Sequence, residues 1–158
     1  MIDRFEKFSF GIFEISRNWN KLASVELEKL GLKGPHALYL MTMLKYPQGI
    51  TAPKLCELCG KNKSDVSRMM SIMEEKGIVV KESVYQNRYG GVFTLTEKGK
   101  AAATQLEKRV ALAVELAGKD LSDEKRTAFY EALESISENL RILSRDGIPE
   151  TEEKSDLV

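Results

Sequence analysis

The sequence predicts a mainly α-helical fold that carries one small β-hairpin. Apolar residues recur every three or four positions near both ends of the chain, as they do on one face of a helix. In the middle, the β-branched segments 78–82 and 92–96 flank a polar stretch, which is typical of two strands joined by a protruding loop. A chain of 158 residues can bury a core that needs no disulfide or metal to fold.

The first predicted helix covers residues 2–30, and Gly31 follows it where a helix end favours a positive φ. Its apolar face consists of Phe5, Phe8, Ile12, Ile15, Trp19 and Leu22. So long a helix has little to cover it within a small domain. We therefore expect this face to pack against another helix pair or a second subunit.

A shorter helix is predicted after Gly34, with Pro35 at its first position, where the missing N–H is harmless. We expect its buried side to comprise Ala37, Leu38, Leu40, Met41 and Leu44.

Two further short helices are separated by a tight turn. Ile50-Thr51 forms a short link, and its threonine caps a helix over 52–59. Gly60-Lys61 forms the turn, and Asn62 caps a helix over 63–76.

Two long helices are predicted after the hairpin, over 97–117 and 123–145. The apolar face of the last helix consists of Phe129, Leu133, Ile136, Leu140 and Leu143. The acidic residues 150–158 are expected to be loose.

This order of elements fits a winged helix-turn-helix, in which the second helix of the motif enters the major groove of DNA by its N-terminal end. The residues expected there are Lys61, Asn62, Lys63, Ser64, Asp65, Ser67 and Arg68. They offer phosphate donors and groups that can contact base edges. This helix alone would fit a solvated helix start in any small bundle equally well.

The loop of the hairpin offers Arg88 at its tip, where it could reach a minor groove, and Lys81 at its base could meet a phosphate. Taken alone, Arg88 fits an ordinary surface residue better.

The stretch from Leu30 to Gly99 resembles the MarR family of bacterial regulators. The matching pieces are Gly31-Leu32, Ser64-Asp65-Val66-Ser67-Arg68, Met73-Glu74-Glu75-Lys76-Gly77 and Leu95-Thr96-Glu97-Lys98-Gly99. With the long flanking helices, the resemblance covers residues 1–145. Arg88 matches the family's minor-groove arginine, but Asn87 stands where the family usually has an aspartate and cannot form its usual ion pair.

The resemblance implies a homodimer that binds a near-palindromic operator in double-stranded DNA and regulates transcription, usually by repression relieved by a small ligand or by oxidation. The implied segments are an N-terminal dimerisation helix over 1–33, a DNA-binding domain over 34–99, C-terminal dimerisation helices over 100–146 and an acidic tail over 147–158.

Charge is distributed unevenly along a chain whose net charge is zero. Residues 45–100 carry ten Lys/Arg against six Asp/Glu, a balance of +4, while residues 146–158 carry one against five, a balance of −4. Positive charge in the middle segment favours contact with a polyanion there.

Cys56 and Cys59 form a C-x-x-C pair on a predicted helix. A zinc site needs four ligands, and the chain has one histidine to add. A redox switch needs an exposed thiolate of low pKa, for which Lys54 and Lys61 are near in sequence. Packing of two small side chains is the favoured interpretation.

The resemblance to the MarR family implies an effector site that lies between the DNA-binding lobe and the dimer helices. His36 could contact an anionic or phenolic ligand there, with Trp19 and Tyr39 nearby. A histidine bonded to the backbone is the favoured alternative, and the two aromatic residues would equally suit the core.

No catalytic motif is present, so we expect neither an enzyme nor a bound cofactor or metal. The N-terminal residues lack the apolar core of a signal peptide, and no apolar run would span a membrane, which predicts a cytoplasmic protein. Two alternatives to an effector-responsive regulator stay open. One is a thiol- or metal-responsive regulator using Cys56 and Cys59, and the other is a winged-helix protein-interaction module.

Overall fold

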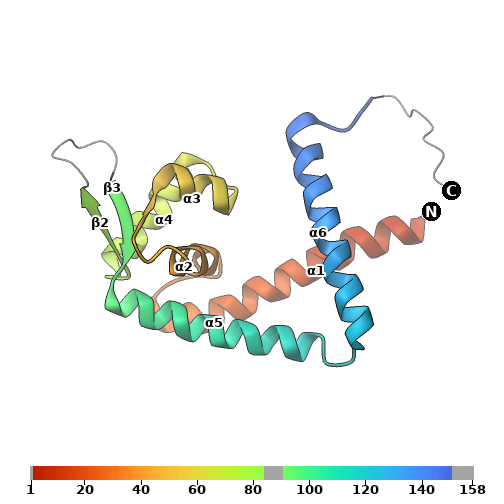
Figure 1. Ribbon diagram of the computed structural model, residues 1–158, viewed down its shortest axis with the longest axis horizontal. Coiled ribbons are helices and arrows are strands. Elements are labelled where there is room, and N and C mark those ends of the chain that lie inside the picture. Colours follow the sequence, from red (N-terminus) through yellow and green to blue (C-terminus); the bar gives the residue numbers. More distant parts are fainter. Residues whose placement is uncertain (1, 84–90, 151–158) are drawn as a thin grey trace. The chain divides into compact units, whose positions relative to one another are not determined.

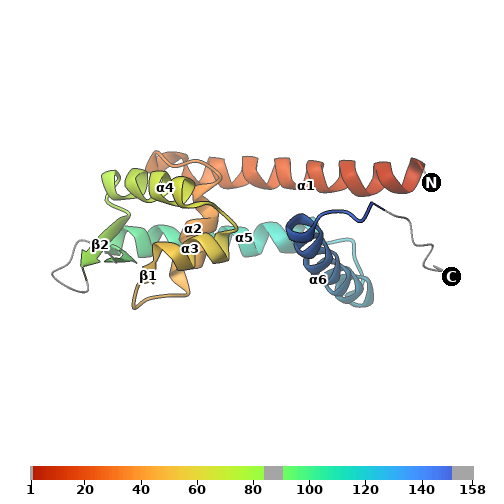
Figure 2. The ribbon, with the colours of Figure 1, turned by 90° about the horizontal axis from the view of Figure 1, so that it is seen from above.

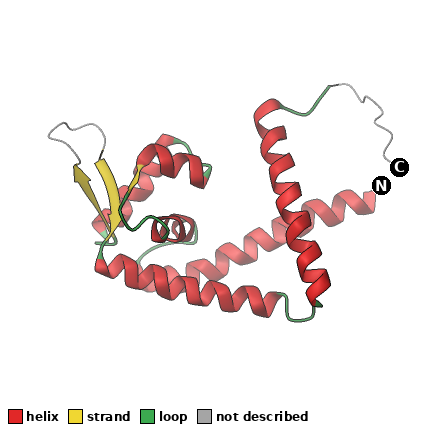
Figure 3. Cartoon of the chain, viewed as in Figure 1, coloured by secondary structure: helices red, strands yellow, loops and turns green. Residues whose placement is uncertain are grey.

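The computed structural model describes residues 2–83 and 91–150. It divides into two compact units, Met1–Ala113 and Val114–Val158. The helices and strands follow one another as shown in Figures 1 and 3: α1 (Ile2–Leu27), the 3-10 turn η1 (Glu28–Leu30), α2 (His36–Leu44), β1 (Ile50–Thr51), α3 (Ala52–Cys59), α4 (Lys63–Glu75), β2 (Val79–Ser83), β3 (Gly91–Leu95), α5 (Glu97–Ala117) and α6 (Asp123–Asp146). The predicted fold class, mainly helical with a small β-structure, is confirmed.

The helices begin where the sequence places capping side chains. Thr51 Oγ1 accepts the N–H of Lys54 at 3.4 Å, Asn62 Oδ1 that of Asp65 at 2.8 Å, and Ser122 Oγ that of Lys125 at 3.3 Å. Each bond satisfies an N–H that has no partner inside its helix. The first helix ends earlier than predicted, at Leu27, and the 3-10 turn η1 follows it before Gly31.

The sheet has three antiparallel strands in the order β1-β3-β2. The predicted pairing of the two longer strands is confirmed, and Lys81 lies opposite Phe93 in their register. The third strand, β1, was expected to be a link, but Ile50 pairs with Phe93 on the other edge of β3. A two-residue strand is too short for alternation in the sequence to reveal it.

The core of the first unit lies between α2, α3, α4, the sheet, the C-terminal end of α1 and the first half of α5. Its largest fully buried side chains are Tyr39, Leu27, Leu40, Met43, Leu55, Met70, Met73, Ile78 and Val66. The prediction for α2 was wrong at Leu38, which is 46% exposed, whereas Tyr39 and Met43 face inward. Nearly every residue of α2 is apolar, so the sequence could not fix which side of this helix faces the core.

The apolar face of α1 is exposed over much of the helix. Phe5 is 69% exposed and Ile15 is 64% exposed, whereas Ala23 and Leu27 near the C-terminal end are buried. Figure 2 shows why: the N-terminal half of α1 extends beyond α2, α3 and α4. The C-terminal half is fixed by two polar contacts, from the N–H of Gly34 to Ser24 Oγ at 2.8 Å and from Arg109 Nε to Glu26 Oε1 at 2.9 Å.

In the second unit, α6 also leaves its predicted apolar face exposed, including Phe129 at 46% and Leu133 at 45%.

The start of α5 is packed tightly against the turn that joins α4 to β2. Thr96 Oγ1 donates to the carbonyl oxygen of Gly77 at 2.7 Å and accepts the N–H of Gly99 at 3.0 Å. Gly99 is buried against the backbone of Ile78, and a Cβ at this position would collide with the Ile78 carbonyl oxygen.

We predict that Gly99→Ala lowers the free energy of unfolding by about 3 kcal/mol, because the added methyl group forces α5 away from Ile78. Gly60→Ala is the control, since nothing lies near its Cβ position and its φ of 59° costs an alanine about 1 kcal/mol. Urea denaturation measures both. Equal losses from the two variants would contradict this account of the junction.

Candidate nucleic-acid interface

A tight turn joins α3 to α4 and forms the helix-turn-helix. Gly60 ends α3 in the left-handed region with a φ of 59°, which favours glycine. The N–H of Lys61 then bonds to the carbonyl oxygen of Cys56 at 3.0 Å, and Asn62 begins the next helix. Figure 1 shows the two helices beside each other next to the strands.

The predicted DNA-contacting residues of this motif lie together at the N-terminal end of α4. Those with exposed side chains are Lys61, Asn62, Lys63, Ser64, Ser67 and Arg68, and Asp65 is half-buried beside them. The opposite side of α4 places Val66, Met70 and Met73 in the core. Burial of that apolar side therefore presents the polar turn to solvent.

The same turn concentrates groups that bind anions. The N-terminal end of a helix carries free N–H groups and a partial positive charge, and Lys61 and Lys63 add full charges beside it. Ser64, Ser67 and Ser71 supply hydroxyl groups along the exposed face, where Ser71 Oγ bonds to the carbonyl oxygen of Ser67 at 3.0 Å. The arrangement can hold phosphates and contact base edges.

Sequence reasoning missed one feature of this surface, an ion pair between Asp65 and Arg68. Arg68 Nη2 donates to Asp65 Oδ1 at 2.8 Å. The signal was present in the sequence, because an acidic and a basic residue three positions apart lie on neighbouring parts of a helix surface.

The predicted minor-groove residue Arg88 lies outside the described residues, as does Asn87 beside it. At the base of the hairpin, Lys81 is exposed, and its Nζ lies 5.6 Å from the centre of the Phe93 ring. This distance is within the range of a cation–π interaction.

The two cysteines differ in exposure. Cys59 is buried, its Sγ lies 3.7 Å from the Thr42 hydroxyl oxygen, and burial raises the pKa of its thiol. Cys56 is half-buried. A buried thiol of raised pKa is a poor nucleophile, which favours the packing interpretation. Over residues 2–83 and 91–150, no three His, Cys, Asp or Glu side chains gather as metal ligands would.

The predicted effector residues do not share one environment. His36 is buried, and its Nδ1 lies 3.0 Å from the backbone nitrogen of Lys33. Its Nε2 is also buried and has no hydrogen-bond partner among the residues that the structure describes. Burial lowers the pKa of His36 and raises that of Tyr39, so both side chains are neutral near pH 7. Tyr39 faces the core, whereas Trp19 is 38% exposed on α1.

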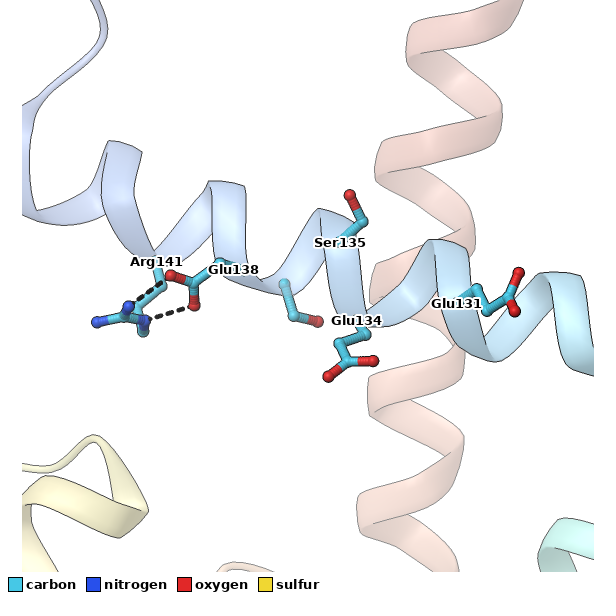
Figure 4. A pocket seen from close by; sticks show the side chains of 6 residues that line it. Glu131, Glu134, Ser135, Glu138 and Arg141 are labelled. Carbon is cyan, nitrogen blue, oxygen red and sulfur yellow. Dashed lines mark hydrogen bonds and ion pairs between the residues drawn. The ribbon is translucent and has the colours of Figure 1, made fainter.

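A hollow on α6 is lined by residues of that helix alone: Glu131, Glu134, Ser135, Ser137, Glu138 and Arg141. Figure 4 shows Arg141 turned toward Glu138. Arg141 Nε donates to Glu138 Oε2 at 2.9 Å, and Arg141 Nη2 donates to Glu138 Oε1 at 2.6 Å. One face of one helix encloses no ligand, so we assign no site to this hollow. Within the described residues, no helix combines the length and apolarity needed to cross a membrane.

Comparison with known proteins identifies the fold. No family model and no curated protein matches the sequence. Among solved structures, the chain is similar to a MarR family transcriptional regulator from Listeria monocytogenes complexed with 26mer DNA, with 21% identity and a TM-score of 0.76 over 89% of this chain and 95% of that one.

Two further structures show the same likeness. A MarR transcriptional regulator from Methanosarcina mazei Go1 has 22% identity and a TM-score of 0.77, over 87% of this chain and 99% of that one. An uncharacterized SlyA-like transcription regulator from Listeria monocytogenes has 20% identity and a TM-score of 0.78, over 90% of this chain and 97% of that one. The chain therefore has a MarR-like winged helix-turn-helix fold, as the sequence predicted.

We predict that iodoacetamide modifies Cys56 about tenfold faster than Cys59 at pH 8, because the buried Cys59 has less thiolate and less access to reagent. Peptide mass spectrometry after timed quenching measures both rates. In guanidinium the two rates should converge, which is the control for intrinsic reactivity. Equal rates in the folded protein would revive the thiol-responsive alternative.

Proposed function

We propose that this chain is a sequence-specific regulator of transcription that binds double-stranded DNA as a homodimer. The observation that carries the proposal is the exposed polar turn at the start of α4, held outward by the buried face of the same helix. In helix-turn-helix proteins this is the end of the recognition helix that contacts base edges in the major groove.

Charge and comparison support the same function. The balance of +4 over residues 45–100 favours a polyanion at the middle segment, although the whole chain is neutral. One protein of similar fold, which matches 89% of this chain, is complexed with 26mer DNA. A protein-interaction module would not need lysines and an arginine clustered at the start of a helix.

The exposed apolar faces of α1 and α6 support a dimer. Large apolar side chains such as Phe5 and Ile15 are costly to leave in water, and each face follows the spacing of a helix that packs against other helices. A two-fold dimer would repeat α4 at about one helical turn of DNA, roughly 34–36 Å.

The regulatory part of the proposal is a cytoplasmic, non-enzymatic repressor that a small-molecule effector releases from DNA. His36 supports an effector contact, because its buried Nε2 has no partner within the described chain. The burial of Cys59 argues against the thiol-responsive alternative, and we do not adopt it.

We predict that Arg68→Ala weakens binding to a specific DNA site by about 1–3 kcal/mol, because a base contact is lost. Gel shifts with the DNA that flanks its own gene, at two salt concentrations, measure the affinity of each variant. The control is Lys119→Ala, which removes one exposed positive charge outside the motif. Equal weakening on random DNA would mean that Arg68 contacts phosphates, and unchanged binding would remove it from the interface.

A second prediction concerns the dimer. Ile15→Glu should convert the protein to monomers at micromolar concentration, because it places a charge in the apolar face of α1. Light scattering after size-exclusion chromatography measures the mass, and circular dichroism checks the fold. Gln48→Glu adds the same charge at an exposed loop residue and should leave the mass unchanged. A dimeric Ile15→Glu protein would place the interface elsewhere.

A further inference from the structure

The ion pair on the recognition surface joins a short, less exposed side chain to a long, more exposed one. The Asp65 side chain is 37% exposed, and its backbone N–H is bonded to the capping oxygen of Asn62 at 2.8 Å. The Arg68 side chain is 66% exposed. Because the aspartate side chain is shorter and less exposed and starts from a capped backbone position, the pair mainly restricts the position of the guanidinium.

A single hydrogen bond from Arg68 leaves most of its donors available. The guanidinium has five N–H groups in a rigid planar fork, and Asp65 takes one of them, on Nη2. Whichever of the two Nη2 hydrogens is used, one edge of the fork keeps both of its parallel N–H groups. That edge is the group that pairs with O6 and N7 of guanine in the major groove.

The pair contributes little to the stability of the fold. Exposed ion pairs three residues apart on a helix gain a small Coulomb energy that salt screens, and they restrict two flexible side chains. At a surface that faces DNA, a carboxylate is also repelled by phosphates. Its position beside Arg68, the only basic residue of α4 after Lys63, therefore suggests a role in recognition.

We propose that Asp65 is a specificity-determining residue that holds Arg68 in place to contact guanine. The carboxylate fixes the guanidinium before DNA arrives, so less side-chain freedom is lost when the base is bound. It also partly neutralises Arg68, which weakens the attraction of this side chain to phosphates of any sequence. This inference rests on the proposed DNA-binding function and adds the base that the recognition helix selects.

The test begins with duplexes selected from a random library by the wild-type protein. Guanines in the selected site are replaced one at a time by 7-deazaguanine, which lacks the N7 acceptor. The quantity compared is the ratio of affinities for the selected site and for random duplex. A wild-type protein that selects no sequence would contradict the proposed function itself, and this inference with it.

Asp65→Asn should lower the ratio about tenfold, partly by strengthening binding to random duplex. In the same variant, replacing one guanine per half-site by 7-deazaguanine should reduce the affinity less than it does for the wild-type protein. Glu57→Gln is the matched control, because it removes a carboxylate from another exposed i,i+3 pair, with Lys54 Nζ at 2.9 Å, in the same motif. It should change both affinities together and leave the ratio unchanged.

A double-variant cycle separates positioning from direct contact. When Arg68→Ala is already present, Asp65→Asn should leave the ratio unchanged, because no guanidinium remains to be held. A further fall in that background would show that Asp65 acts on DNA by itself and would overturn the inference. The inference would also fail if wild-type protein is selective and Asp65→Asn preserves its ratio. Thermal unfolding of each variant confirms that the fold is intact.

Discussion

Burial of one side of α4 is the constraint on which the functional surface depends. Val66, Met70 and Met73 occupy the core at helical spacing, so the opposite side of the same helix must face water. At the N-terminal end of the helix, the Asn62 side chain binds the N–H of Asp65 and leaves the first N–H groups exposed to solvent. A rigid helix end with free donors results from apolar packing several residues away.

The same packing fixes the hairpin and α1 relative to this helix within the first unit. Thr96 connects Gly77, at the end of α4, to the start of α5, and Gly99 allows α5 to approach Ile78 closely. The backbone of Gly34 also approaches α1 closely, next to Ser24. Two glycines thus permit close backbone contacts that a side chain would block, one between α5 and Ile78 and the other between α1 and the loop before α2.

Much of this fold was predictable because its determinants are local. The caps at Thr51, Asn62 and Ser122 each depend on residues three positions apart, and the two longer strands pair with their neighbour along the chain. The orientation of α2 was not predictable, since Leu38 and Tyr39 are both apolar enough to be buried and only tertiary packing chooses between them. In the candidate site, the sequence predicted which residues form the exposed surface. It did not predict where the Arg68 side chain points, because the spacing permits a contact with Asp65 but does not establish it.

Under the proposed function, zero net charge fits a protein that gains selectivity from restraint of its charges. A strongly basic surface binds every sequence, because phosphates are the same everywhere, and such binding lowers the contrast between sites. Here the lysines at the helix start are few, and the one guanidinium of α4 is shared with a carboxylate. In the proposed complex, weak general attraction and a restrained donor pair would shift the balance from affinity toward base selection. On this view, Asp65 is useful at the interface because it opposes binding to DNA that lacks the correct base.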